Sequence, residues 1–184
     1  EQIGYGGRLK EINKAAVRIA HEAAMPDTLI AGDICLTWKY DPWDPASRDG
    51  VRGLFDQQVE FQLSGGDPDF IVGETFLWAG EAALALERIK ALGKTAVVPL
   101  SFEGPTTKEG LSEGEAAKML EGAGADVVGV NCWTDPKHAL PLVKQMREVV
   151  SCYVAAQSVA YRCTDEVSFF VGQPGFPDRI DDYK

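Results

Sequence analysis

Residues 124–132 read GADVVGVNC, in which a glycine precedes an unbroken apolar run that stops at an asparagine and a cysteine. A continuous run of this kind is typical of a strand covered on both faces, as in parallel sheets packed under helices, because a half-exposed strand would alternate apolar and polar residues. We therefore predict a buried strand over Asp126 to Val130. Asn131 and Cys132 would then follow its carboxyl end.

Similar apolar runs occur along the rest of the chain, at Thr28 to Gly32, Phe70 to Gly73, Ala96 to Leu100 and Tyr153 to Ala156. Segments with the three-to-four-residue period of an amphipathic helix precede and separate these runs, at Leu9 to Ala23, Val51 to Leu63, Ala82 to Leu92, Ala116 to Leu120 and Leu140 to Met146. Helices that alternate with buried strands predict an α/β fold with a parallel sheet.

Short signals mark where the predicted helices begin and end. Glycines follow the last periodic residue of three of them, where a left-handed cap is expected. An Asp-Pro pair and a Ser-x-x-Glu capping box mark two helix starts. The residues concerned are Gly65-Gly66, Gly93 and Gly124 for the ends, and Asp135-Pro136 and Ser112 with Glu115 for the starts.

Two architectures contain such alternation, the (β/α)8 TIM barrel and the open doubly wound sheet. No GxGxxG follows the first predicted strand, so a dinucleotide-binding sheet has no support. Polar residues stand at or beyond the predicted strand ends, the face on which barrel enzymes build their active sites. They are Asp33, Glu74, Ser101 with Glu103, Asn131 with Cys132, and Gln157. We predict a single domain over residues 1–184, containing about five central βα units of a barrel that needs eight.

The composition excludes several classes of partner. The formal net charge is -10, so the chain offers no basic surface for nucleic-acid phosphates or an anionic membrane. No apolar run approaches the roughly 18 residues of a membrane span. The four cysteines show no CxxC spacing and no dense disulfide framework. These features predict a soluble cytoplasmic protein with reduced thiols.

Three residues at the predicted strand ends are candidates for chemistry. Cys132 is either a packing residue or a metal-binding thiolate. Glu74 directly follows a buried strand, where a carboxylate needs a partner or solvent, and it suits a substrate ammonium group. Asn131 either forms a turn or shapes the site. Asp33 is a weaker candidate of the same kind as Glu74, because aspartate also caps helices and turns.

Other polar and aromatic residues have simpler explanations. His21 and His138 lie on predicted helices and lack metal-ligand spacing to another histidine or cysteine. The aromatic residues Trp38, Tyr40 and Trp43 follow the first predicted strand, and they either cover the core or line a pocket for a cationic methyl donor.

Several segments together resemble the homocysteine S-methyltransferase family, which includes betaine-using enzymes and the homocysteine-binding domain of methionine synthase. The most specific is GVNC at residues 129–132, preceded by GAD at 124–126. The others are Arg8-Leu9, the run 13–20, Ile30 to Asp33, Gly73 to Phe76 and Gly175-Phe176-Pro177. The resemblance covers essentially the whole chain.

The resemblance implies an eight-stranded barrel that holds Zn²⁺ through three cysteine thiolates. Cys132 matches the first of them. The other two form a GGCC segment after the last strand, which has no counterpart before Lys184, and the first two strands would precede Glu1. By the same resemblance Glu74 pairs with the amino group of homocysteine, Asn131 shapes the site beside the thiolate, and Tyr40 contacts the methyl donor.

The resulting prediction is a zinc-dependent methyltransferase that moves a methyl group to homocysteine and forms methionine. Thr75 stands where the betaine-using enzymes have a tyrosine, and Asp33 replaces a small residue. The donor therefore stays open between an onium compound, such as betaine, dimethylsulfoniopropionate or S-methylmethionine, and a methyl-folate or corrinoid. The oligomeric state is also open, and a homo-oligomer is one possibility.

Two alternatives remain. One is a barrel that acts as a non-catalytic binding or structural subunit, and the other is a metal-independent lyase with Glu74 as its base.

Overall fold

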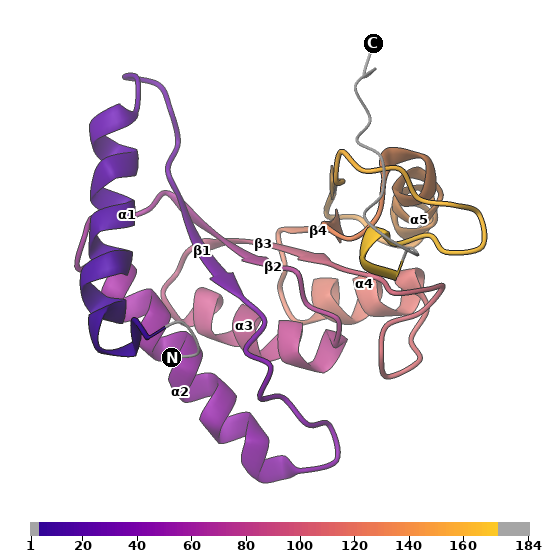
Figure 1. The fold of residues 1–184 in the computed structure, drawn as a ribbon, viewed down its shortest axis with the longest axis horizontal. Coiled ribbons are helices and arrows are strands. Elements are labelled where there is room, and N and C mark those ends of the chain that lie inside the picture. The colour runs from indigo at the N-terminus through magenta and orange to yellow at the C-terminus, as the bar shows by residue number, and fades with distance from the viewer. Residues whose placement is uncertain (1–3, 173–184) are drawn as a thin grey trace.

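A computed structural model of the chain describes residues 4–172. Its five strands form one sheet in the order β1-β2-β3-β4-β5, and all neighbouring pairs are parallel. Each strand is followed by a helix or loop that returns to the start of the next, and α2, α3 and α4 lie along one side of the sheet (Figure 1). The α/β class is confirmed, and the sheet is consistent with part of a TIM barrel.

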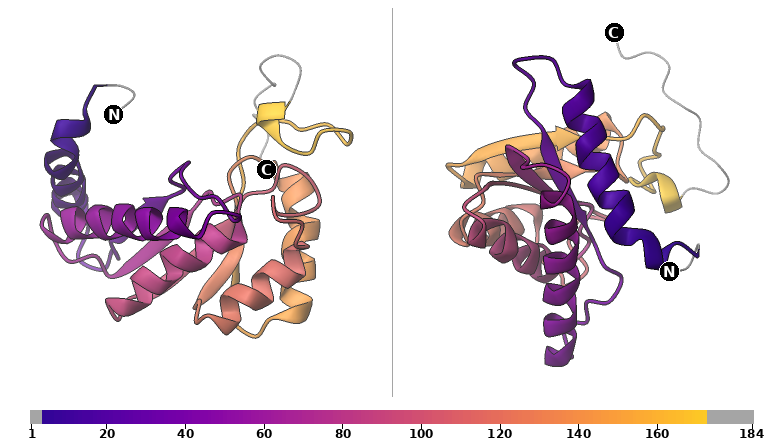
Figure 2. Two further views of the ribbon diagram at one scale, coloured as in Figure 1. Left: turned by 90° about the horizontal axis from the view of Figure 1, so that it is seen from below. Right: turned by 90° about the vertical axis from the view of Figure 1, so that its left-hand side faces the viewer.

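The structure assigns the following bounds. The strands are β1 Ala31–Cys35, β2 Phe70–Glu74, β3 Thr95–Leu100, β4 Val127–Asn131 and β5 Tyr153–Gln157. The helices are α1 Leu9–Ala23, α2 Pro45–Leu63, α3 Ala79–Ala91, α4 Glu113–Gly122 and α5 Pro136–Val149, with short 3-10 turns at Gly6–Arg8 and Phe170–Gly172. Figure 2 shows the helices from two further sides.

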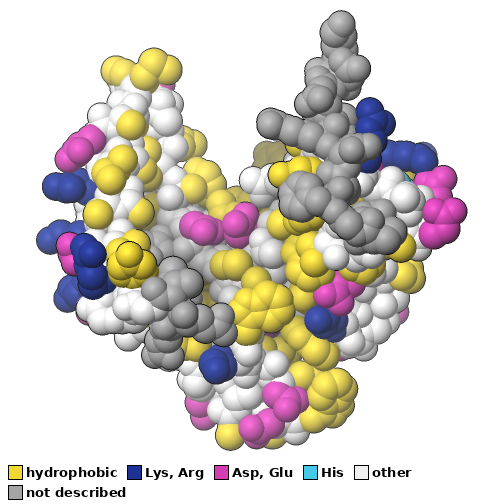
Figure 3. Space-filling model, in the orientation of Figure 1, with side chains coloured by type: hydrophobic (Ala, Val, Ile, Leu, Met, Phe, Trp, Pro, Cys, Tyr) yellow, Lys and Arg dark blue, Asp and Glu magenta, His cyan; other side chains and the backbone are white. Residues whose placement is uncertain are grey.

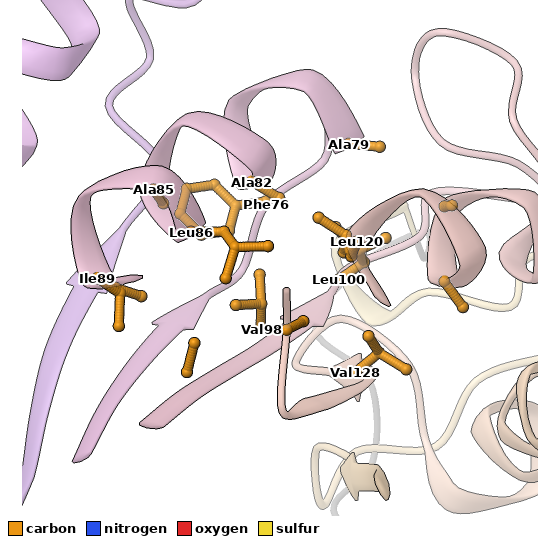
Figure 4. Packing of buried hydrophobic residues seen from close by; sticks show 14 of the residues in the cluster. Phe76, Ala79, Ala82, Ala85, Leu86, Ile89, Val98, Leu100, Leu120 and Val128 are labelled. Carbon is orange, nitrogen blue, oxygen red and sulfur yellow. The ribbon is translucent and has the colours of Figure 1, made fainter. Parts of the chain in front are cut away.

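The hydrophobic core lies between the sheet and its helices. Alternate strand side chains point to this side, among them Ile34, Val98 and Val128, each at most 1% exposed. Phe76, in the loop before α3, is fully buried and meets Phe55 of α2 edge to face, with ring centroids 5.9 Å apart. Figure 4 shows Phe76 among the helix and strand side chains of this cluster.

Within the described residues, the opposite face of the sheet is exposed mainly at its two edge strands, β1 and β5. Side chains on this face include Glu74, which is half-buried, and Tyr153, which is 79% exposed. The molecule is hollowed between α1 and the region around α5, and acidic side chains lie in the middle of the hollow (Figure 3). The expectation that the strands are covered on both faces is met at the carboxyl ends of β3 and β4, where Pro99, Gly129 and Asn131 are buried, but not at β1 and β5.

The first strand begins later than predicted. The apolar run favoured Thr28 to Gly32, whereas β1 covers Ala31–Cys35 and pairs Ala31 with Phe70. This register buries Ile34 completely and leaves Leu29 69% exposed. The sequence prediction was wrong because it took Asp33 as the end of the strand, but Asp33 lies inside it and Cys35 ends it.

Most helix boundaries extend beyond their apolar stripes. α2 begins six residues before Val51, at Pro45, because the Asp44 side chain accepts a hydrogen bond from the Ala46 amide and proline suits the first helical turn. The capping box of Ser112 and Glu115 and the Asp135 cap of α5 are confirmed.

Two of the three glycine helix ends are also as predicted. Gly93 and Gly124 adopt left-handed φ values of 70° and 99°. Gly65-Gly66 does not adopt a left-handed φ. A side chain at Gly65 would instead overlap the backbone of Lys14, so this glycine allows α1 and the end of α2 to approach closely.

None of the helices in the described part of the chain is both long and apolar enough to cross a membrane. Gly175-Phe176-Pro177, part of the resemblance noted from the sequence, lies outside the described residues.

Candidate functional site

The polar side chains at the ends of β2, β3 and β4 form one cluster. Glu74 is the last residue of β2 and Asn131 the last residue of β4, while Ser101 directly follows β3 between them. In a parallel sheet these carboxyl ends share one edge, which is where α/β proteins bind ligands. The structure thus brings together residues that are up to 57 positions apart in the chain.

Asn131 is the centre of this cluster. Its side-chain Nδ2 donates to Glu74 Oε2 at 3.3 Å and to Thr75 Oγ1 at 3.0 Å, while its Oδ1 accepts the Thr75 amide at 3.1 Å. A backbone amide can only donate, so the Thr75 amide fixes which end of the Asn131 side chain is the oxygen. The NH₂ group must then face Glu74.

Ser101 supports Asn131 from the neighbouring strand. Its hydroxyl donates to the Asn131 carbonyl oxygen at 2.8 Å, and both residues are at most 2% exposed. Buried polar groups are costly unless they are hydrogen-bonded, so this contact helps to hold the end of β4 in place.

Cys132 follows Asn131 in a tight turn. Its backbone φ is 51° and that of Trp133 is 50°, a left-handed conformation that side chains rarely adopt. The Cys132 amide donates to the Gln157 carbonyl at 2.9 Å, which continues the β4-β5 ladder to the thiol. Burial, with a smaller effect of the Glu74 charge, raises the pKa of the Cys132 thiol. A thiolate at this position therefore needs a cation beside it.

The chain after β5 packs on this turn. The Val159 amide donates to the Thr134 carbonyl at 3.0 Å, and the Phe170 amide donates to the Trp133 carbonyl at 2.7 Å. The Thr134 hydroxyl donates to the Ser168 carbonyl at 2.6 Å. The Cys132 turn is thus fixed from β5 and from the loop that follows it.

Two further groups of β1 lie near Glu74. Burial, together with the Glu74 charge, raises the pKa of Asp33 to about 6. Burial and the charges of Asp33 and Glu74 raise the pKa of Cys35 to about 11. The Thr75 side chain partly opposes the rise in the pKa of both Cys35 and Cys132. The site is therefore acidic at its β1 side and suits a cationic group there.

Tyr40 lies apart from this cluster. Its ring packs against Trp78 with centroids 6.1 Å apart, and its hydroxyl lies against Gly80 at the start of α3. Together with Trp38, Glu81 and Lys108 it lines a cavity of about 100 Å³ at the same edge of the sheet. The structure thus groups Glu74, Asn131 and Cys132 but not Tyr40.

The two histidines are not placed for metal binding. His138 lies between Asp135 at 2.6 Å and Asp165 at 3.1 Å, and His21 lies against Gly66. Within residues 4–172 there is no group of three or more His, Cys, Asp or Glu side chains that could hold a metal ion. All four cysteines of the sequence are free thiols.

The sequence did not reveal that Thr75 and Cys35 lie in the surroundings of Glu74. Thr75 lacks a pattern of its own, because its contacts depend on its left-handed backbone and on a residue two strands away. The sequence analysis missed Cys35 because it ended the first strand at Gly32, whereas β1 ends at Cys35. Gly32 and Ile34 are buried on one face of β1, and side chains alternate between the two faces of a strand. This alternation could have placed Cys35 on the opposite face.

The comparisons with known proteins identify the family of the chain. Residues 1–167 match the family model described as homocysteine S-methyltransferase. Betaine-homocysteine S-methyltransferase 1 of Mus musculus is 34% identical over 175 residues, which cover 91% of this chain and 42% of the mouse protein. The Xenopus tropicalis protein of the same name is also 34% identical, over 91% of this chain and 43% of its own length. The chain thus spans about two fifths of these relatives.

A solved structure shares the fold. The homocysteine methyltransferase MmuM from Escherichia coli, in its apo form, aligns with a TM-score of 0.66 at 17% identity, over 84% of this chain and 61% of MmuM. The family match over residues 1–167 includes Glu74, Asn131 and Cys132. The chain belongs to the homocysteine S-methyltransferase family.

Proposed function

We propose that the protein transfers a methyl group from a small donor to the sulfur of homocysteine and forms methionine. The observation that carries this proposal is the convergence of Glu74, Asn131 and Cys132 at one edge of the sheet, in a chain of this family. The sulfur, once deprotonated, bonds to the donor's methyl carbon. The bond from that carbon to the donor breaks, and its electron pair leaves with the donor.

Each residue of the cluster has a separate role in binding homocysteine. Glu74 accepts the substrate ammonium group, because within residues 4–172 its carboxylate forms no ion pair with a cationic side chain and contacts the Asn131 amide instead. Asn131 fixes the position of the Glu74 carboxylate from the side. We propose that the substrate sulfur is held beside Cys132, which directly follows Asn131.

The described residues supply only part of the zinc site that the family resemblance implies. A zinc ion deprotonates coordinating thiols and, in a catalytic site, leaves one position open for substrate. Cys132 offers a soft thiol ligand with a raised pKa that a metal would overcome. The two further thiolates of the family have no counterpart beside it in the described residues. We propose that Cys132 is the ligand that this part of the protein supplies.

The cavity beside Tyr40 has the chemistry of a subsite for the donor. Aromatic rings of Trp38, Tyr40 and Trp78 line it, and such rings attract onium groups. The carboxylate of Glu81, 1% exposed, lies in the lining and accepts hydrogen bonds from neutral donors of Thr37. Lys108, also in the lining, could receive a carboxylate. We propose a zwitterionic onium compound, such as betaine, as the methyl donor.

The donor subsite is tested by comparing Trp38→Ala with Trp43→Ala. Both tryptophans are at least 71% exposed, but Trp38 lines the cavity and Trp43 does not. We expect W38A to raise the KM for the onium donor about threefold to tenfold, as a lost cation–π contact would, and to leave the KM for homocysteine unchanged. Equal donor KM values for W38A, W43A and the wild type would contradict the subsite.

The role of Glu74 is tested by Glu74→Gln in the full-length protein. The amide keeps the shape and can still accept from Asn131, but it loses the charge that pairs with the substrate ammonium. We expect the KM for homocysteine to rise at least about tenfold, in line with a charge-assisted hydrogen bond. Glu103→Gln is the matched control for homocysteine binding, because Glu103 lies at the same edge of the sheet but pairs with Lys108 of the donor cavity at 3.5 Å, so E103Q should leave the KM for homocysteine unchanged. If the protein binds homocysteine but forms no methionine with any donor, the alternative of a non-catalytic binding subunit is correct.

A further inference from the structure

Thr75 has a backbone conformation that requires an explanation. Its φ is 62°, in the left-handed region that β-branched residues avoid. Such a conformation costs on the order of 1–3 kcal/mol and persists only where surrounding contacts determine it, often at functional sites. Thr75 stands between Glu74, the last residue of β2, and Phe76, which is fully buried in the core.

The contacts that determine this conformation come from Asn131. The Thr75 amide donates to Asn131 Oδ1 at 3.1 Å, and the Thr75 hydroxyl accepts from Asn131 Nδ2 at 3.0 Å. The left-handed turn is what allows the amide and the hydroxyl of one residue to reach the two ends of one side-chain amide. A buried polar network of this kind holds its members in a single arrangement when all of them are satisfied.

This double contact also orients the group that meets Glu74. With its oxygen held by the Thr75 amide, Asn131 presents its NH₂ to Glu74 Oε2 at 3.3 Å. The same NH₂ group serves both Thr75 and Glu74, so loss of the Thr75 hydroxyl removes one of the two Thr75 contacts that hold the Asn131 side chain in place and leaves only the contact to the Thr75 amide. Cys132 directly follows Asn131 in the chain.

We infer that Thr75 is a positioning residue for homocysteine: through Asn131 it fixes the Glu74 carboxylate that receives the substrate ammonium group. The inference rests on the proposed function. The sequence predicted no role for the Thr75 side chain. We infer that this side chain keeps the ammonium site at a fixed position relative to Cys132.

The test compares Thr75→Val with Thr75→Ser. Valine keeps the branched shape and the backbone amide but removes the hydroxyl, whereas serine retains the hydroxyl. We expect T75V to raise the KM for homocysteine about fivefold to twentyfold, with the donor KM within twofold of the wild type, and T75S to restore the wild-type value within about twofold. Calorimetric titration with homocysteine should show the same order of affinities.

A control separates positioning from stability. Thr107→Val removes another buried threonine hydroxyl, which accepts the Leu111 amide at 3.2 Å away from the cluster. T107V should leave both KM values unchanged. The inference is overturned if T75V binds homocysteine as the wild type does, or if T75S fails to restore the affinity. If the wild type converts no homocysteine with any donor, the proposed function itself is wrong.

Discussion

Replacing Gly129 with alanine should destabilise the protein more than any other single-methyl change at the sheet. Gly129 pairs with Ala155 in the β4-β5 ladder. A Cβ at Gly129 would overlap the Ala155 carbonyl oxygen and lie 2.9 Å and 3.0 Å from its carbonyl carbon and amide nitrogen. These are backbone atoms that cannot rotate away, so the two strands must separate.

We expect Gly129→Ala to lower the free energy of unfolding by about 3 kcal/mol or more, at the upper end of overpacking effects. For a protein of this size that corresponds to a fall in Tm of roughly 6–12 °C, measured by thermal unfolding of the full-length protein. Gly122→Ala is the matched control, because a Cβ at Gly122 at the end of α4 meets nothing within 4 Å. A G129A variant as stable as G122A would show that β4 and β5 are not packed as described.

The sequence predicted the order of the elements well because buried strands and amphipathic helices differ in period. It placed β2 and β4 within one residue at each end, and Glu74, Asn131 and Cys132 at strand ends. These residues could be recognised because polar side chains directly after an apolar run have few structural reasons to be there.

The errors came from features that depend on tertiary pairing. β1 shifted by three residues because its register with β2 determines its bounds, while the apolar run begins earlier at Thr28. α2 began earlier than its stripe because Asp44 caps it and Pro45 opens it, on a turn that carries no buried side chain.

The hydrogen bonds of the site could not be predicted from the sequence, because they also depend on tertiary structure. Asn131 reaches Thr75 across 56 residues, and Ser101 reaches Asn131 across 30. Such hydrogen bonds depend on β2, β3 and β4 lying side by side with their ends level, which no local pattern encodes. The position of Tyr40 against Trp78 likewise depends on how the loop after β1 folds over α3.

Replacing Cys132 with alanine should have the largest effect on activity. Cys132 is the cysteine that the family resemblance assigns to zinc, and it follows Asn131 at the centre of the cluster. Loss of an outer-shell partner of a metal typically costs 10–100-fold, so loss of a ligand should reduce methionine formation by more than about 100-fold. The side chain is half-buried and small, so C132A should remain folded, with a circular dichroism spectrum like that of the wild type.

Cys35 provides a control with closely similar surroundings. Like Cys132 it is a half-buried thiol at a strand end, and its pKa is raised by burial and by nearby carboxylates, Asp33 and Glu74 for Cys35 and Glu74 for Cys132. The family resemblance assigns no role to Cys35. Cys35→Ala should therefore retain most of the activity that C132A loses.

The most direct measurement is the zinc content of the purified full-length protein, determined together with methionine formed from homocysteine and an onium donor, in the wild type, C132A and C35A. We predict about one zinc ion per chain and methionine formation in the wild type and in C35A, and the loss of both in C132A. A C132A variant that keeps its zinc and forms methionine at the wild-type rate would contradict the assignment of Cys132 and the function proposed from it.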